Sequence, residues 1–330
     1  MSTVGSIIES QGRKPVTLAT LRAMASRGEP FACLTCYDAS TARWLEQAGV
    51  HLLLVGDTAA EVILGLPRTI DMPLDVLLAL TAAVKRGAPN TVVMGDMPFM
   101  SYQAGADEAM RNAGRFLVEG RADVVKIEAD ASFAPLVQRM TAAGIPVCAH
   151  VGSRPQHVAL TSGYKAQGRT ADEARRIVED ARALEAAGAV MLLVEAVPTE
   201  VAQEVVQSAG VPVIGIGAGP DCHGQVVVLH DVMGLLDKTP GLAQPVANLG
   251  PLIREAAMQW VRRVAEKDFG GKTFSMRQAP RVAGLAPPRT CERTVPASSG
   301  VPAHRCVRTL GLCGGGACDG SSRWDRRRWC

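Results

Sequence analysis

The chain has 330 residues and a formal net charge of +3, and 47% of its residues are hydrophobic whereas only 4% are aromatic. The excess positive charge lies in residues 280–330, which contain nine Arg against two Asp and one Glu. The rest of the chain is slightly acidic, so its charge gives no reason to expect nucleic-acid binding. No apolar run approaches the roughly 18 residues needed to cross a bilayer, and the N-terminus lacks the features of a signal peptide. We therefore expect a cytoplasmic protein that does not associate with membranes.

Four cysteines precede the basic C-terminal stretch, and all four lie among apolar neighbours: Cys33, Cys36, Cys148 and Cys222. Buried, reduced thiols are the expected state for such residues in a cytoplasmic protein. Cys33 and Cys36 form a CxxC pattern inside an apolar run, but no second Cys or His pair follows at zinc-binding spacing. A structural zinc site is therefore not expected.

Eight short apolar runs recur along the chain with helix-like stretches between them. Continuous apolar runs of this length are typical of strands that are buried on both faces of a parallel sheet. The expected strands are 31–36, 52–56, 91–95, 123–127, 146–150, 190–195, 212–216 and 225–230. Eight strand and helix pairs predict an α/β fold, a closed (β/α)₈ TIM barrel. A doubly wound sheet is the alternative, but the glycine-rich dinucleotide fingerprint is absent after the first strand.

The stretches between these runs have the apolar periodicity of amphipathic helices. The expected helices are 40–49, 74–87, 107–120, 131–144 and 171–188, and a last helix at 247–266 would complete the ring. Five of these stretches end in glycine, as helix C-termini often do: Gly49, Gly87, Gly120, Gly144 and Gly188. We therefore expect residues 1–277 to form one catalytic barrel domain.

Residues 278–330 are rich in Arg, Cys, Gly and Pro and lack any periodicity. Such a composition does not provide enough apolar surface to form a core. We interpret this stretch as a disordered C-terminal extension, or as the product of a shifted reading frame, and assign it no function.

Acidic side chains follow three consecutive expected strands, at Asp57, Asp96 and Glu128. In this kind of barrel the catalytic groups lie at the carboxyl ends of the strands, so these carboxylates should converge. Because grouped carboxylates repel one another, a divalent cation between them is the expected solution, and hard oxygen ligands favour Mg²⁺. Each of these carboxylates, taken alone, could instead have a purely structural role, and for Asp57 that role would be a helix N-cap or a turn residue.

Lys126 and Glu128 are two residues apart on one expected strand, so their side chains share a face while Ile127 points the other way. Opposite charges inside a barrel need partners, because an isolated buried charge is costly. For this pair a structural ion pair is as reasonable as a functional one.

Two further polar residues end expected strands. Glu195 follows an apolar run with no basic neighbour in sequence, so partial burial should raise its basicity enough to remove a proton from carbon. As a single Glu it could equally be the partner in a buried ion pair. His150 could be either a histidine of the core with its hydrogen bonds satisfied or a hydrogen-bond donor to the substrate.

Several motifs together resemble the ketopantoate hydroxymethyltransferase family. They are TCYDAS (35–40), LLLVGDT (52–58), VKRGAP (84–89), GDMPFMSY (95–102), VVKIEA (124–129), IPVCAHVGSRPQ (145–156), GYKAQGRT (163–170), ALEAAGAVMLLVEAVP (183–198) and VPVIGIGAG (211–219). The resemblance covers about residues 15 to 277 and keeps the order and spacing of the motifs. The segment after Thr58 departs from the family pattern most, and Thr58 itself stands where the family commonly has Ser.

The resemblance implies a Mg²⁺-dependent barrel enzyme of pantothenate biosynthesis. It would transfer a hydroxymethyl group from 5,10-methylenetetrahydrofolate to 3-methyl-2-oxobutanoate, giving 2-dehydropantoate. The same resemblance implies a homo-oligomer, a decamer in this family. By residue, it implies metal binding by Asp57, Asp96 and Glu128, substrate binding by Asp57, Thr58, Asp96, Lys126 and His150, and proton abstraction by Glu195.

Two other functions fit part of this pattern. A Mg²⁺-dependent aldolase or lyase acting on another 2-oxo acid would use the same carboxylates without folate. The reactive-cysteine loop of the isocitrate lyase group, such as KKCGH, is missing from the chain. A non-catalytic barrel is the third possibility, although it would have no physical need for the charged strand ends.

Overall fold

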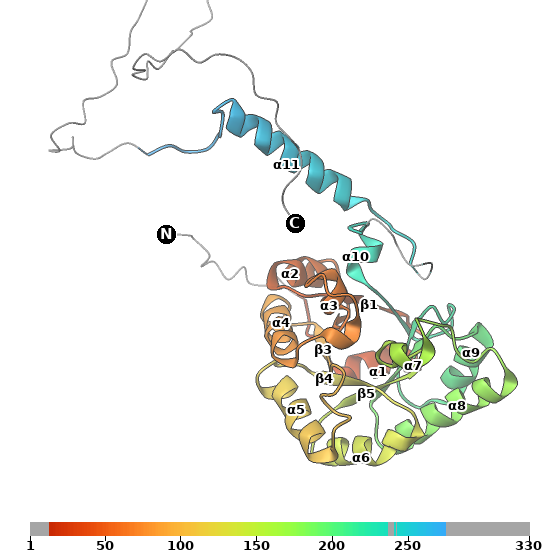
Figure 1. Ribbon diagram of the computed structural model, residues 1–330. Helices are drawn as coiled ribbons and strands as arrows, with labels where there is room; N and C mark the ends of the chain where they lie inside the picture. The colour runs from red at the N-terminus through yellow and green to blue at the C-terminus, as the bar shows by residue number, and fades with distance from the viewer. Residues whose placement is uncertain (1–12, 237–240, 242, 275–330) are drawn as a thin grey trace, which may run out of the picture. The chain divides into compact units, whose positions relative to one another are not determined.

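A computed structural model of the chain describes residues 13–236, 241 and 243–274. Eight parallel strands form a closed barrel in which each strand pairs with its neighbours in sequence order, and β1 pairs with β8 (Figure 1). The strands are β1 Phe31–Thr35, β2 Leu52–Val55, β3 Val92–Asp96, β4 Val124–Glu128, β5 Val147–Gly152, β6 Met191–Glu195, β7 Val213–Ile216 and β8 Gly224–Val227. The predicted TIM barrel is thus confirmed.

Longer helices follow one another around the outside of the barrel, as Figure 1 shows for α4, α5, α6, α8 and α9. The helices are α1 Leu18–Ser26, α2 Ala39–Gln47, α3 Ala59–Val62, α4 Leu74–Gly87, α5 Ala106–Val118, α6 Ala134–Ala142, α7 Val158–Thr161, α8 Ala171–Ala186, α9 Thr199–Ser208, α10 Leu229–Val232 and α11 Leu249–Ala265. Three short 3-10 turns accompany them, η1 Thr69–Asp71, η2 Ala131–Phe133 and η3 Pro155–His157. Helix α5 shows how closely the layers pack, because a side chain on Gly95 of β3 would overlap the ring of Phe116.

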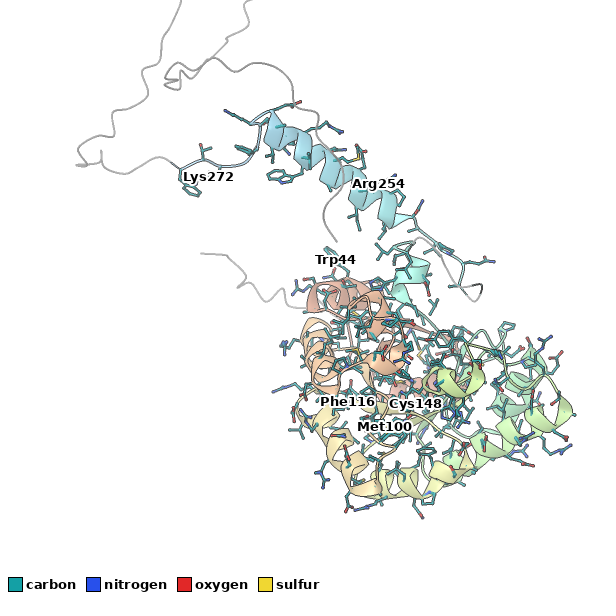
Figure 2. All side chains as sticks on the ribbon, viewed as in Figure 1. Trp44, Met100, Phe116, Cys148, Arg254 and Lys272 are labelled. Carbon is teal, nitrogen blue, oxygen red and sulfur yellow. The ribbon has the colours of Figure 1, made fainter. Side chains whose placement is uncertain are left out.

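The strand residues alternate between two apolar layers, one inside the barrel and one under the helices. The inner layer includes Met94, Val124 and Cys148, and Figure 2 shows Cys148 among the packed side chains of the barrel. Helix α1, which was not predicted, adds the fully buried Leu21 to this inner layer. The four predicted core cysteines are all buried and unpaired.

Two sequence predictions about element ends need correction. The last expected strand, 225–230, ends at Val227, and the backbone turns into α10 where the N–H of Leu229 donates to Thr35 Oγ1 at 2.9 Å. Of the expected glycine helix ends, Gly49, Gly144 and Gly188 have the positive φ of such ends. Gly87 and Gly120 do not. Gly87 is the last residue of α4, and its missing side chain leaves room for the backbone of Ala39.

The last long helix, α11, was expected to complete the ring, but none of its residues is buried. The outward-facing residues of β1 and β8 also lack full cover, since Ala32 and Gln225 are exposed, whereas every residue of β2, β3 and β4 is buried. In the described structure, α11 therefore does not cover the barrel wall. None of the helices formed by described residues could span a membrane. The stretch interpreted as an extension, 278–330, lies outside the described residues.

Candidate active site

The charged residues singled out in the sequence lie next to one another at the carboxyl ends of the strands. The strand register pairs Asp96 with Lys126, Glu128 with His150, and Gly152 with Glu195. Residues opposite each other on paired strands are close neighbours. The barrel therefore places these side chains side by side around one opening.

Asp57 and Asp96 are joined by a backbone contact. The N–H of Asp57 donates to Asp96 Oδ2 at 3.1 Å, and both residues are almost fully buried. Asp57 is not a helix N-cap, because Thr58 holds the N-cap position of α3 and makes no capping hydrogen bond with its side chain. The N-cap alternative for Asp57 is therefore excluded, although its backbone does lie in a turn, where Asp57 O accepts the N–H of Ala60 at 2.9 Å.

Lys126 pairs with Asp96, and not with Glu128 as its position in the sequence had suggested. The Nζ atom lies 2.7 Å from Asp96 Oδ1, with the two side chains only 5% and 2% exposed. Burial, together with the charge of Asp57, raises the pKa of Asp96 to about 7 although Lys126 opposes the shift. The nearby carboxylates outweigh the effect of burial on Lys126 and raise its pKa, so the lysine stays charged.

Glu128 keeps one carboxylate oxygen bonded and the other without a partner. Its Oε2 accepts the backbone N–H of Gln156 at 3.0 Å, whereas the buried Oε1 has no hydrogen bond. Burial raises the pKa of Glu128 well above its usual value; Asp57 and Asp96 add to the shift, which Lys126 opposes. A buried carboxylate oxygen without a partner is costly unless a proton or a cation meets it.

His150 lies between Lys126 and Glu195. Its Nδ1 is 3.5 Å from Lys126 Nζ, and its Nε2 is 3.5 Å from Glu195 Oε2. Burial and the charge of Lys126 lower the pKa of His150 far below its usual value, so the ring is neutral. A neutral ring that accepts from the lysine at Nδ1 carries its proton on Nε2, toward Glu195.

Glu195 differs from the other carboxylates in its access to solvent. Its side chain is 20% exposed, whereas the side chain of His150 is 2% exposed. Burial of most of the carboxyl raises the pKa of Glu195 to about 7; Lys126 opposes this shift, and Asp57 and Asp96 add to it. Glu195 can therefore exchange protons near neutral pH with a molecule at the barrel opening.

Two residues of the site were missed in the sequence. Gln156 and Tyr102 are both buried, and the Tyr102 hydroxyl donates to Gln156 Oε1 at 2.7 Å. Both stand inside the quoted family motifs, but uncharged residues in loops give no signal of their own in one sequence. Only the fold shows that these loops reach the carboxylates.

The segment that departs most from the family pattern lies on one side of the opening. It forms α3 and η1, which is tied by an ion pair between Arg68 and Asp71 at 2.6 Å. The Tyr164 hydroxyl donates to Glu61 Oε1 at 3.1 Å, which links this segment to the loop after α7. Tyr164 also has a hydrogen bond to Thr69 of η1, so it joins the two loops through both α3 and η1.

Known proteins resemble this chain over most of its length. A family model described as ketopantoate hydroxymethyltransferase matches residues 15–272. The chain belongs to this family. It is 44% identical over 268 residues to the 3-methyl-2-oxobutanoate hydroxymethyltransferase of Syntrophus aciditrophicus (strain SB), a match that spans 81% of this chain and 98% of that protein. The enzyme of the same name from Pyrobaculum arsenaticum is 44% identical over 245 residues, which is 74% of this chain and 92% of that protein.

Solved structures show a more distant likeness. Phosphoenolpyruvate phosphomutase from Streptomyces platensis subsp. rosaceus aligns with a TM-score of 0.53 at 16% identity, over 77% of this chain and 89% of that one. A phosphonopyruvate hydrolase in complex with oxalate and Mg²⁺ aligns with a TM-score of 0.51 at 15% identity, over 76% and 88%. At such low identity the likeness supports the barrel fold alone.

The family found from the motifs is therefore confirmed, and with it the prediction of a hydroxymethyltransferase. The distant likeness to solved structures concerns the fold and gives the aldolase or lyase alternative no support. The roles of individual residues stay predictions, because no comparison tests them.

Proposed function

We propose that the chain transfers a hydroxymethyl group from 5,10-methylenetetrahydrofolate to 3-methyl-2-oxobutanoate and gives 2-dehydropantoate, a step of pantothenate biosynthesis. The observation that carries the proposal is the position of Glu195, a reachable carboxyl with a pKa of about 7 beside a buried cluster of charges. The reaction must remove a proton from the carbon beside a ketone. A base that is half ionised at neutral pH is suited to this task.

We further propose that Asp57, Asp96 and Glu128 hold a divalent cation, Mg²⁺ by preference. The unpartnered Glu128 Oε1 and the raised pKa values of Asp96 and Glu128 fit this role, because a cation would offset the crowded negative charge. In the described ranges, no three His, Cys, Asp or Glu side chains are arranged to hold a metal as they stand. Mg²⁺ commonly keeps several waters and uses only one or two carboxylates plus substrate oxygens, so a partial set suffices. When bound, the cation polarises the 2-oxo group as a Lewis acid.

Side chains of the protein would remove the proton and bind the substrate. Glu195 accepts the proton from C3 of the oxo acid, and neutral His150 lies beside this carboxylate, with its Nε2 3.5 Å from Glu195 Oε2 and without a hydrogen bond to it. Lys126 keeps a positive charge at the barrel opening, which offsets the negative charge of the substrate. Thr58, at the start of α3, offers its hydroxyl to the substrate.

A turnover assay tests the proposal directly. The full chain is incubated with Mg²⁺, 3-methyl-2-oxobutanoate and formaldehyde, with and without tetrahydrofolate, and 2-dehydropantoate is measured. We expect product formation that depends on tetrahydrofolate. Folate-independent cleavage of a larger 2-oxo acid, with no hydroxymethyl transfer, would instead favour the aldolase alternative.

We also propose that the enzyme is a cytoplasmic homo-oligomer, a decamer as the family resemblance implies. Helix α11 supports assembly because Leu252, Ile253, Trp260 and Val264 recur at helical spacing and are all exposed. Trp44 on α2 is 70% exposed and projects from the packed side chains (Figure 2). Exposed apolar surface of this kind commonly marks a protein interface.

The association state can be tested with paired substitutions in α11. Trp260→Glu places a charge in the apolar stripe, whereas Arg262 lies about 200° around the helix and gives the control Arg262→Gln. Light scattering coupled to gel filtration should show smaller particles for Trp260→Glu and the wild-type mass for the control. A wild-type protein that runs as a monomer at all concentrations would contradict the oligomer.

A further inference from the structure

A single uncharged residue touches two of the three carboxylates of the site. Gln156 lies in η3, which begins three residues after the end of β5, and its side chain is buried. Pro155 at the first position of this turn fixes one backbone angle, and the N–H of His157 closes the turn on Arg154 O at 2.9 Å. The backbone of Gln156 is thus fixed before its side chain makes any contact.

The contacts of Gln156 with the carboxylates come from two different parts of the residue. The side-chain Nε2 donates to Asp57 Oδ2 at 3.0 Å, and the backbone N–H donates to Glu128 Oε2 at 3.0 Å. Each contact occupies one oxygen of the carboxylate. For Glu128 the other oxygen, Oε1, is buried and has no hydrogen bond.

The amide of Gln156 cannot turn over without losing all its bonds. Its second N–H donates to Met97 O at 3.0 Å, and its Oε1 accepts from Tyr102 at 2.7 Å and Gln103 at 3.0 Å. A primary amide has two donors and two main acceptor positions, so this side chain is fully satisfied. Tyr102 is held in turn by the N–H of Glu128, which donates to its hydroxyl at 3.1 Å.

The neutrality of the residue is as important as its shape. A lysine or arginine in this place would hold Asp57 by cancelling its charge and would compete with a cation. A glutamate would add a fourth negative charge and would have no donor. Only a neutral donor orients the carboxylate and leaves its charge for a metal ion.

We propose that Gln156 is a positioning residue that sets Asp57 and Glu128 for a divalent cation, through its side-chain amide and its backbone N–H respectively. This inference rests on the metal site proposed above. Removing the side chain frees Asp57 alone, because the backbone N–H that holds Glu128 remains. Loss of such an orienting contact typically weakens metal binding by about 10- to 100-fold.

The test measures Mn²⁺ binding to the full chain by calorimetry, without any turnover. Gln156→Leu keeps the size of the side chain and removes its hydrogen bonds. Gln103→Leu is the matched control, since Gln103 bonds the same amide but no carboxylate. We expect a dissociation constant for Mn²⁺ about tenfold or more above wild type in Gln156→Leu and close to wild type in Gln103→Leu.

A second readout separates positioning from a general loss of stability. The water proton relaxation enhancement of bound Mn²⁺ reports how many waters the ion carries, and it should rise in Gln156→Leu if Asp57 no longer binds. Unchanged affinity and unchanged relaxation in that variant would overturn the inference. If Gln156→Leu does not fold, Tyr102→Phe decides, because the Tyr102 hydroxyl bonds both the Gln156 amide and the N–H of Glu128, whereas Gln103 bonds the amide alone. Loss of this hydroxyl should lower Mn²⁺ affinity in the same direction. Wild-type protein that binds no Mn²⁺ would overturn the proposed metal site itself.

Discussion

Replacing Glu195 with Gln keeps the shape of the side chain and removes its ability to accept a proton. A positioned general base typically contributes about 10²- to 10⁴-fold in rate, so exchange of the C3 proton of 3-methyl-2-oxobutanoate should slow by that factor. Glu195 is not among the proposed metal ligands, and Mn²⁺ affinity should stay at the wild-type value. Glu200→Gln, an exposed change of the same kind at the start of α9, is the control.

The pH dependence of the C3 proton exchange rate gives a second quantity that the assay can check. The pKa of Glu195 is raised to about 7, so the carboxyl is protonated below that pH and ionised above it. Roughly a tenth of the molecules hold the active base at pH 6 and roughly nine tenths at pH 8. Wild-type exchange should therefore rise about tenfold across this range and then level off.

The assay follows deuterium uptake at C3 by nuclear magnetic resonance, with Mg²⁺ and without folate. Glu195→Gln should lower the rate by about 10²- to 10⁴-fold and abolish its dependence on pH. If Glu195→Gln exchanges at the wild-type rate, or keeps the same rise between pH 6 and 8, another group is the base and the reasoning fails.

Three further predictions concern the stability of the fold around the site and the C-terminal stretch. Lys126→Met leaves Asp96 buried without its counter-charge, which should lower the metal-free unfolding free energy by about 3–5 kcal/mol where Asp96 is ionised. Because protonation of Asp96 relieves this cost, urea unfolding should show a larger loss of stability at pH 8.5 than at pH 6. Equal losses at the two pH values would contradict this prediction. Gly95→Ala drives a methyl group into the Phe116 ring and should cost about 1–3 kcal/mol in urea unfolding, whereas Gly114→Ala on α5 meets open space and should be neutral or stabilising. Deleting residues 280–330 should leave turnover intact, and loss of folding would show that the stretch is needed.

Strands and long helices were predictable because their apolar periodicity is repeated over many residues. Helix 74–87 was predicted with the bounds that α4 has, and every expected strand is present. The short helices were not, because α3 and α10 contain only four residues each and give no periodic signal. The end of the last strand was wrong for the same reason, since the apolar letters of 225–230 continue into α10.

The charged members of the site were predictable because polar residues at the ends of apolar strands stand out in a barrel. Their partners were less so. Lys126 was considered beside Glu128, yet its ion pair is with Asp96 on the neighbouring strand, a contact that strand register alone determines. Gln156 bonds Asp57 from 99 positions away in the chain, and no spacing rule in a single sequence reaches that far.

The pairing of β1 with β8 has a consequence for how the chain folds. Phe31 lies opposite Gly224 in this register, and a side chain on that glycine would overlap the phenylalanine ring. This seam joins the first and last strands, so it has the highest sequence separation of any strand pair in the barrel, and we expect it to form late in folding. Its outer side carries the exposed Ala32 and Gln225, and an open seam presents unpaired strand edges to other chains. A lower protein concentration during refolding should therefore favour barrel closure, and a higher one should favour aggregation.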